Sequence, residues 1–230
     1  VGRRSFGKGL VQRPMNLGDG SAVRMTVQQY FTPTGRCIQK PYDDGVEAYR
    51  NDPITRFENG ELLSLDSLKL PDSLKYHTLI KKREVYGGGG IIPDIFVPID
   101  TTSNSESFRK TLNKGLMNKY AHEYVDAKRS ELTNAYPTED DFVSGYSLSK
   151  NEIKEFREFV ANEGVEISNE EWAISGEAMK VRLIAFIGRN LFESSTFYRI
   201  IGELNETLLE AIEILKDGRF EKARLAQRTF

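Results

Sequence analysis

Hydrophobic and polar residues alternate with a period of two in the first part of the chain. The clearest alternation lies in residues 22–31, where Val23, Met25 and Val27 are separated by polar residues. A period of two with β-branched residues is typical of a β-strand. A shorter strand is expected at 10–15.

Turn signals punctuate this first part. Asp19-Gly20 lies between the two expected strands and predicts a tight hairpin turn. Further elements expected here are a turn at 32–35, extended structure at 36–39, a short helix at 53–59, a pair of strands within 76–86 and a short edge strand at 91–98.

The second part has apolar residues spaced three and four apart, which predicts amphipathic helices. Ser149 followed by Glu152 suits a capping box, and Gly218 suits a C-terminal cap. The expected helices are 105–134, 138–145, 149–163, 170–193 and 195–217, followed by an irregular tail to Phe230.

Composition changes near residue 102, because seven of the eight prolines precede it. We therefore predict an α+β chain with a β-rich domain at 1–102 and a helical domain at 103–230.

Charge and cysteine content exclude several classes of protein. Lys and Arg total 32 against 34 Asp and Glu, a net charge of −2, which favours neither a nucleic-acid binder nor a polybasic membrane-surface protein. Cys37, the single cysteine, and two histidines, His77 and His122, leave no internal disulfide and no His/Cys zinc cluster. The apolar runs are too short for a membrane span. The chain opens at Val1 without Met and is expected to be a fragment.

A glycine-rich segment opens the chain. Gly2, Gly7 and Lys8 match most of a phosphate-binding P-loop. Gly9 replaces the Ser or Thr that would hold magnesium, and a strand rather than a helix is expected next. Nucleotide binding is therefore disfavoured.

The same segment suits the presentation of a lysine. If residues 7–12 are extended, Lys8 and Gln12 project from one face, where the Gln amide can orient an amine. A lysine is a general base only when neutral, which requires lowering a pKa of about 10.4 to about 7–8. That demands an apolar pocket, for which Phe6, Leu10 and Val11 are candidate walls.

Four blocks in the same order resemble the C-terminal processing peptidases, also called tail-specific proteases. The blocks are VGRRSFGKGLVQ at 1–12, LGDGSA at 17–22, YFTPTGRCIQ at 30–39 and GIIPD at 90–94. The resemblance covers residues 1 to about 98, with a long insertion at about 40–89. It makes the first domain the C-terminal part of a mixed α/β peptidase core, and the helical remainder resembles an extension carried by some envelope-localised bacterial members.

The resemblance implies a serine endopeptidase that cleaves exported polypeptides near their C-termini without metal or organic cofactor. Lys8 falls on the family's general base and Gln12 on the glutamine that positions it. The nucleophilic serine, the PDZ domain and the oxyanion-hole donors are expected upstream, and Ser5 and Ser21 are expected to be structural. The chain alone is therefore expected to be inactive, and the protein to lie in the periplasm or cell envelope.

A different class of function stays open beside the enzyme. The alternative is that the helical domain is a non-catalytic interaction or oligomerisation module of an envelope protein. Unpaired strand edges favour self-association of the fragment. Membrane association is expected only through parts that are not in this chain.

Overall fold

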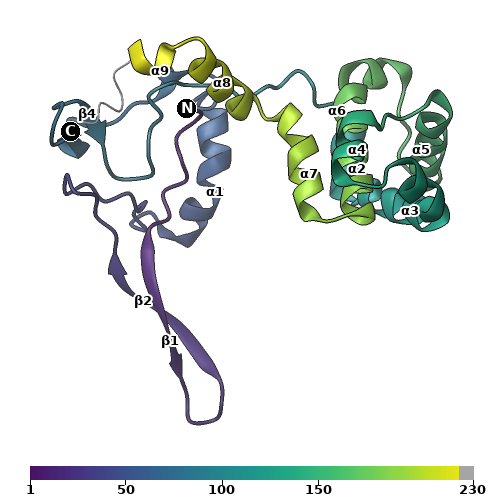
Figure 1. Cartoon of the computed structure of the whole chain (residues 1–230). Coiled ribbons are helices and arrows are strands. Elements are labelled where there is room, and N and C mark those ends of the chain that lie inside the picture. The colour runs from purple at the N-terminus through teal and green to yellow at the C-terminus, as the bar shows by residue number, and fades with distance from the viewer. Residues whose placement is uncertain (223–230) are drawn as a thin grey trace. The chain divides into compact units, whose positions relative to one another are not determined.

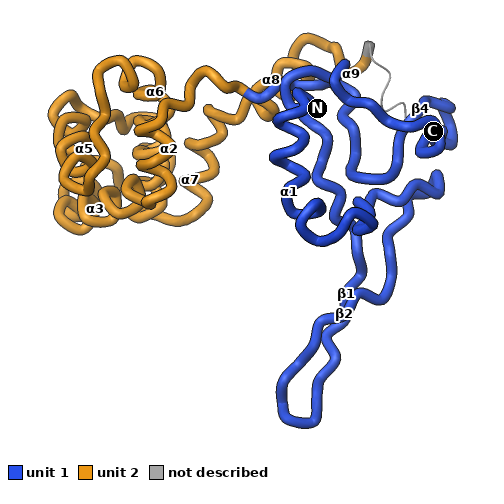
Figure 2. The backbone as a smooth tube through the Cα atoms, turned by 180° about the vertical axis from the view of Figure 1, so that it is seen from behind, with its two compact units in different colours: residues 1–99 blue, residues 100–230 orange. Residues whose placement is uncertain are grey.

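The computed structural model of the chain describes residues 1–222 and is α+β, as predicted. It divides into two compact units, Val1–Ile99 and the chain from Asp100 onward (Figures 1 and 2). The first unit is built of short strands, turns and a helix, and the second is helical. The domain assignment made from composition stays a prediction.

The first unit has two antiparallel hairpins that are separated in sequence by one α-helix and two 3₁₀ turns. Its elements are β1 Leu10–Asn16, β2 Ala22–Gln29, α1 Gly45–Glu58, η1 Leu65–Ser67, η2 Asp72–Leu74, β3 Lys75–His77 and β4 Glu84–Tyr86. The expected helix at 53–59 is thus the end of a longer one, and the strand pair expected within 76–86 is β3 and β4.

The predicted hairpin of β1 and β2 is confirmed. Its register runs from Leu10 opposite Gln29 to Asn16 opposite Ala22. The turn forms because Asp19 Oδ1 accepts hydrogen bonds from both the amide and the hydroxyl of Ser21. A register shift opposite Val11 and Gln12 leaves an extra residue in β2, which is a β-bulge.

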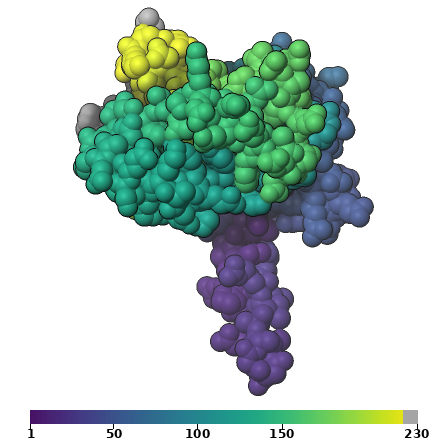
Figure 3. Space-filling model, turned by 90° about the vertical axis from the view of Figure 1, so that its right-hand side faces the viewer, coloured from purple at the N-terminus to yellow at the C-terminus, as the bar shows by residue number. Residues whose placement is uncertain are grey.

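Both faces of β2 are solvent-exposed in this chain. The alternating apolar residues Val23, Met25 and Val27 are 44–49% exposed. Figure 3 shows the side chains of the outer part of this hairpin, in purple, open on the face in view. The period-two pattern therefore marks the strand, while the residues described here do not bury either face.

The edge strand expected at 91–98 is wrong. This segment forms a single parallel bridge, between Phe96 and Gly2, and is otherwise irregular. Pro93 and Pro98 remove two backbone donors from an eight-residue stretch, so a continuous hydrogen-bonded ladder cannot form.

The second unit consists of helices joined by short turns. They are α2 Glu106–Asn113, α3 Leu116–Ala135, α4 Glu139–Gly145, α5 Lys150–Asn162, α6 Asn169–Leu191, α7 Ser194–Ile201, η3 Gly202–Leu204, α8 Glu206–Lys216 and α9 Arg219–Lys222. The last part of the expected irregular tail, 223–230, lies outside the described residues.

Two expected helices are each divided in the structure. The helix predicted at 105–134 breaks at Gly115, whose left-handed φ of +67° interrupts the helical backbone between α2 and α3. The helix predicted at 195–217 becomes α7, η3 and α8, because Asn205 leaves the helix and caps α8 by accepting a hydrogen bond from Leu208 N.

The core of the second unit is rich in aromatic residues. Phe142 is fully buried, and its ring stacks on Tyr146 with centroids 4.6 Å apart. The predicted capping box at Ser149 and Glu152 is confirmed: the Ser149 hydroxyl accepts from Glu152 N, and the Glu152 carboxylate accepts from Ser149 N. These local signals and the apolar stripes fix the ends and inner faces of the helices.

Candidate functional site

Lys8 lies in a tightly packed backbone segment just before β1. Gly7, which precedes it, has a φ of +94°, and a Cβ there would lie 2.5 Å from Gly90 N and 2.9 Å from Ile38 O. A Cβ on Gly9 would lie 2.7 Å from Ile38 Cγ1. Glycine is therefore required on both sides of the lysine, because other segments of the same unit approach the backbone too closely for a Cβ atom.

Hydrogen bonds join this segment to residues 30–40. Gly7 O accepts from Lys40 N at 2.7 Å, and Gly9 O accepts from Tyr30 N at 3.2 Å. The amide of Gly9 donates to Oε1 of the buried Gln39 at 2.8 Å. The backbone on both sides of Lys8 is thus held in one position.

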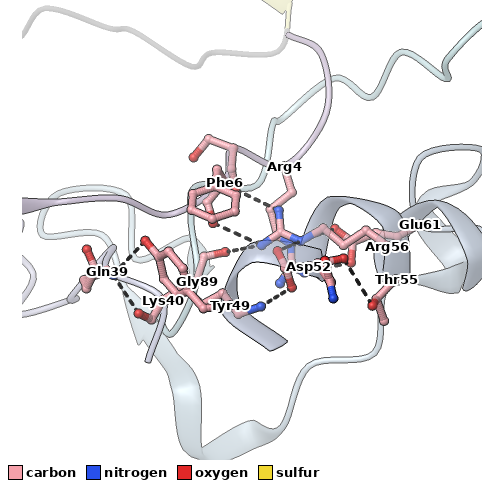
Figure 4. Close-up of polar contacts among 12 residues, drawn as sticks. Arg4, Phe6, Gln39, Lys40, Tyr49, Asp52, Thr55, Arg56, Glu61 and Gly89 are labelled. Atoms are coloured by element: carbon pink, nitrogen blue, oxygen red, sulfur yellow. Dashed lines mark hydrogen bonds and ion pairs between the residues drawn. The ribbon is translucent and has the colours of Figure 1, made fainter. Parts of the chain in front are cut away.

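A buried arginine on α1 holds the residues that precede Gly7. Arg56 is only 5% exposed, and its guanidinium donates to Ser5 O at 2.9 Å and to Phe6 O at 3.2 Å (Figure 4). The Nη2 of Arg56 also lies 3.5 Å from Gly89 O. One side chain therefore bonds to the carbonyls of two segments more than 80 residues apart in sequence.

Acidic residues compensate the buried charge of Arg56. Its Nε lies 2.7 Å from Asp52 Oδ2 and 3.9 Å from Glu61 Oε1. Asp52 also pairs with Lys40, and Glu61 makes a two-pronged ion pair with Arg4 at 2.6 and 2.7 Å. Burial lowers the pKa of Arg56, as does the charge of Arg4, while Asp52 and Glu61 raise it.

The side chain of Lys8 is exposed and, within residues 1–222, makes no hydrogen bond or ion pair. The apolar pocket expected around it is therefore not formed by the residues described. Phe6 instead packs edge-to-face on Tyr49 of α1, with ring centroids 5.0 Å apart. The backbone of Lys8 is fixed while its ammonium is free to meet another group.

Gln12 lies on β1, is exposed, and donates from Nε2 to Thr26 Oγ1 of β2 at 3.4 Å. It also lines a cleft of about 730 Å³ together with Gln29, Tyr42 and Tyr76. Among the described residues no hydrogen bond joins Gln12 to Lys8, so the role of each residue stays a prediction.

The two nearby serines have structural contacts. Ser5 Oγ accepts a hydrogen bond from Ile91 N at 2.9 Å, and Ser21 Oγ donates to Asp19 at 2.6 Å in the hairpin turn. The element that follows Gly9 is strand β1, as expected, rather than the helix that a P-loop requires. A nucleotide cradle is therefore not assembled here, and the structural role expected for Ser5 and Ser21 stays a prediction.

The described part of the chain has neither a cluster of metal-ligating side chains nor a membrane-spanning helix. In residues 1–222, His, Cys, Asp and Glu side chains form no group of three or more that could hold a metal ion. The helices of this same range include none that is long and apolar enough to cross a membrane. The absence of a cofactor stays a prediction.

Sequence reasoning missed the two residues that hold the Lys8 segment. Gln39 ends the third block of the resemblance, yet its pattern gives no sign that its amide binds Gly9. Arg56 lies in a charged, proline-containing segment where an arginine is normally taken for a surface residue. Its position three residues after Pro53 on a helix would not single it out.

Comparison with protein families matches one family model to a part of each unit. Residues 1–48 match the model of peptidase family S41. This segment is therefore similar to that peptidase family, over 48 of the 230 residues. The S41 segment includes Lys8, Gln12, the β1–β2 hairpin and Gln39. Residues 107–193, within the helical unit, match a family of unknown function, DUF8443.

Curated relatives carry names that agree with this assignment. Carboxy-terminal processing protease CtpB of Bacillus subtilis is 36% identical over 75 residues, which are 33% of this chain and 14% of the relative. The chloroplastic C-terminal processing peptidase of Tetradesmus obliquus is 54% identical over 40 residues, 17% of this chain and 9% of the relative. The carboxy-terminal-processing protease of Bartonella bacilliformis is 49% identical over 39 residues, also 17% and 9%. The chain thus spans 14% or less of these relatives, and no solved structure matches it.

Proposed function

We propose that this chain is part of a serine endopeptidase that cleaves polypeptides near their C-termini, in which Lys8 is the general base. The observation that carries the proposal is the state of Lys8 in the S41 segment. Its flanking glycines are locked by Gln39 and by close backbone contacts, while its ammonium has no partner among residues 1–222. A lysine held in this way is ready to meet a nucleophile supplied from outside these residues.

The chemistry follows from general acid–base catalysis. The neutral lysine takes the proton of a serine hydroxyl as the serine oxygen attacks the scissile carbonyl, and then gives that proton to the leaving amine. Water hydrolyses the resulting ester. The lysine is neutral only if it is desolvated, because lowering a lysine pKa from about 10.4 to about 7.5 takes about 4 kcal/mol. Covering the exposed Lys8 with the rest of the enzyme would supply that desolvation.

Gln12 is proposed to orient the lysine in the complete site. Its amide lies at the start of β1, and its hydrogen bond to Thr26 is long at 3.4 Å and solvent-exposed. A long exposed bond is readily exchanged for a bond to a nearby amine. We therefore expect Gln12 to change partner from Thr26 to Lys8 when the site is complete.

The decisive experiment compares variants of the intact enzyme on an unstructured polypeptide substrate. Lys8→Ala should lower kcat by about 10²–10⁴-fold, the usual contribution of a positioned general base. The control Lys69→Ala removes an exposed lysine of the same unit and should leave kcat unchanged. Gln12→Ala should lower kcat by less than Lys8→Ala does.

The 230-residue chain alone is proposed to be inactive, because Ser5 and Ser21 are engaged elsewhere. Cleavage by the purified chain that Lys8→Ala abolishes would contradict this. Full activity of the Lys8→Ala intact enzyme would instead overturn the general-base role.

We also propose a bacterial periplasmic or envelope location. The support is the family assignment of the S41 segment, together with two bacterial relatives named as carboxy-terminal processing proteases. Fractionation of the native cells, followed by detection of the protein with an antibody, tests the proposal. Recovery in the cytoplasmic fraction would contradict it.

A further inference from the structure

Helix α1 provides the contacts that fix the backbone leading to Lys8. Arg56 of this helix bonds to the carbonyls of Ser5 and Phe6 at 2.9 and 3.2 Å. Tyr49, seven residues or about two helical turns earlier, packs edge-to-face on the Phe6 ring and accepts a hydrogen bond from Gln39 Nε2 at 3.3 Å. Both buried residues of α1 therefore face the Lys8 segment.

The guanidinium of Arg56 is oriented from its opposite side. Asp52 Oδ2 forms an ion pair with Nε at 2.7 Å, and Asp52 also pairs with Lys40, whose own amide donates to Gly7 O. The planar guanidinium therefore has a carboxylate at one edge and peptide carbonyls at the other. Lysine, with a compact ammonium, cannot reproduce that two-sided fork.

Burying the Arg56 guanidinium destabilises the folded state unless its contacts with carboxylates and carbonyls are kept. Arg56 is 5% exposed, and burial lowers its pKa, so the folded state must compensate its charge. Asp52 and Glu61 provide the compensation, and the Ser5 and Phe6 carbonyls complete it. The chain conformation from Ser5 to Gly7 is consequently coupled to the position of α1.

We propose that Arg56, oriented by Asp52, is a positioning residue that sets the place of Lys8 through the Ser5 and Phe6 carbonyls. This inference rests on the proposed function of Lys8, but the coupling of Arg56 to the Lys8 backbone can be measured without it. Segment 40–89 then has a role in the site, since its helix α1 supplies the arginine.

The first test is amide hydrogen exchange, measured by NMR on the 230-residue chain. In Arg56→Met, the amides of Gly9 and Lys40 should exchange about 10- to 100-fold faster, as expected when charge-assisted hydrogen bonds are lost. The Gly87 amide, bonded to Leu74 O at 2.9 Å in the same unit, is the internal reference. Arg50→Met, an exposed site on the same helix, should change none of these rates.

Arg56→Lys keeps the positive charge and provides a second variant for the test in case Arg56→Met does not fold. It should accelerate exchange at Gly9 and Lys40 by a smaller factor than Arg56→Met, with Gly87 unchanged. Unchanged exchange at Gly9 and Lys40 in a folded variant overturns the proposal. Equal acceleration at Gly87 in both variants also overturns it, because Arg56 would then support the unit as a whole.

The second test uses the intact enzyme and separates this inference from the proposed function. Arg56→Lys should lower kcat while KM stays within about twofold, because a misplaced base slows the chemical step. A rise in KM alone would make Arg56 a substrate-binding residue and overturn the positioning role. If Lys8→Ala leaves kcat unchanged, the general-base proposal fails, whereas the exchange experiment still decides whether Arg56 positions the segment.

Discussion

Gly7→Ala tests whether the segment before Lys8 is as tightly enclosed as the structure indicates. The added Cβ would lie 2.5 Å from Gly90 N, 2.8 Å from Gly89 C and 2.9 Å from Ile38 O. All three are backbone atoms, so they cannot move aside as a flexible side chain would. The φ of +94° adds conformational strain for any residue with a Cβ.

The expected loss of stability has two parts. A positive φ costs an alanine about 1–2 kcal/mol, and overpacking against fixed atoms costs about 1–3 kcal/mol. Gly7→Ala should therefore lower the free energy of unfolding of the first unit by about 2–5 kcal/mol. Gly45→Ala is the matched control, because Gly45 has a φ of +89° and open space around its Cβ position. Gly45→Ala should therefore lower the free energy of unfolding only by the cost of the positive φ, about 1–2 kcal/mol.

Stability of the first unit can be followed by hydrogen exchange with mass spectrometry on peptides from residues 1–48 in increasing urea. Trp172 is the single tryptophan and lies on α6, so its fluorescence reports the second unit separately. The urea midpoint for unfolding of the second unit should be the same in Gly7→Ala, Gly45→Ala and the unsubstituted chain. Equal losses for Gly7→Ala and Gly45→Ala would refute the argument from close backbone approach.

Three further predictions concern the core, an acidic group and the hairpin. Phe142→Ala should lower the stability of the second unit by about 3–5 kcal/mol, measured by Trp172 fluorescence in urea, because Phe142 is fully buried; a loss below 1 kcal/mol would contradict this. Hydrogen bonds from the side chains of Ser103 and Thr102 lower the pKa of Asp100 from 3.8 to about 2, so its stabilisation is present above pH 4 and lost as pH falls towards 2. The stability difference between wild type and Asp100→Asn, about 1 kcal/mol after solvent screening, should therefore disappear over that range in urea titrations, and a constant difference would exclude this cause. The chain should self-associate at high concentration in gel filtration, because the β1–β2 hairpin has outer edges without a strand partner and Met25 on it is 49% exposed. Met25→Lys should self-associate less. A monomer at every concentration would contradict this prediction.

Local sequence signals predicted the hairpin, the caps and most helices because each depends on a few neighbouring residues. Asp19 and Ser21 complete their turn within three positions, and Ser149 and Glu152 close a capping box within four. The division of the helical part at Gly115 depended on a left-handed φ that a glycine permits and does not require.

The candidate site could be predicted only in part. Lys8 and Gln12 were found from spacing and resemblance, and the requirement for glycine around Lys8 was readable as a tight backbone. The sequence could not predict which atoms enclose Gly7, because Gly90 is 83 residues away and the contact exists only in the folded chain. The apolar pocket expected around Lys8 is not formed by residues 1–222 and stays a prediction, since burial depends on segments that pack against the lysine.

Sequence alone thus determined most of the chain's local elements, its α+β character and the similarity of its first residues to a peptidase family. Tertiary structure alone decided that Arg56 is buried and bonded to the Ser5 and Phe6 carbonyls, and that Gln39 holds Gly9. The physical reason is that an arginine or glutamine has the same local preferences on a surface and in a core. Its partners are set by which distant carbonyls and carboxylates the fold brings within 3 Å or so of its donors.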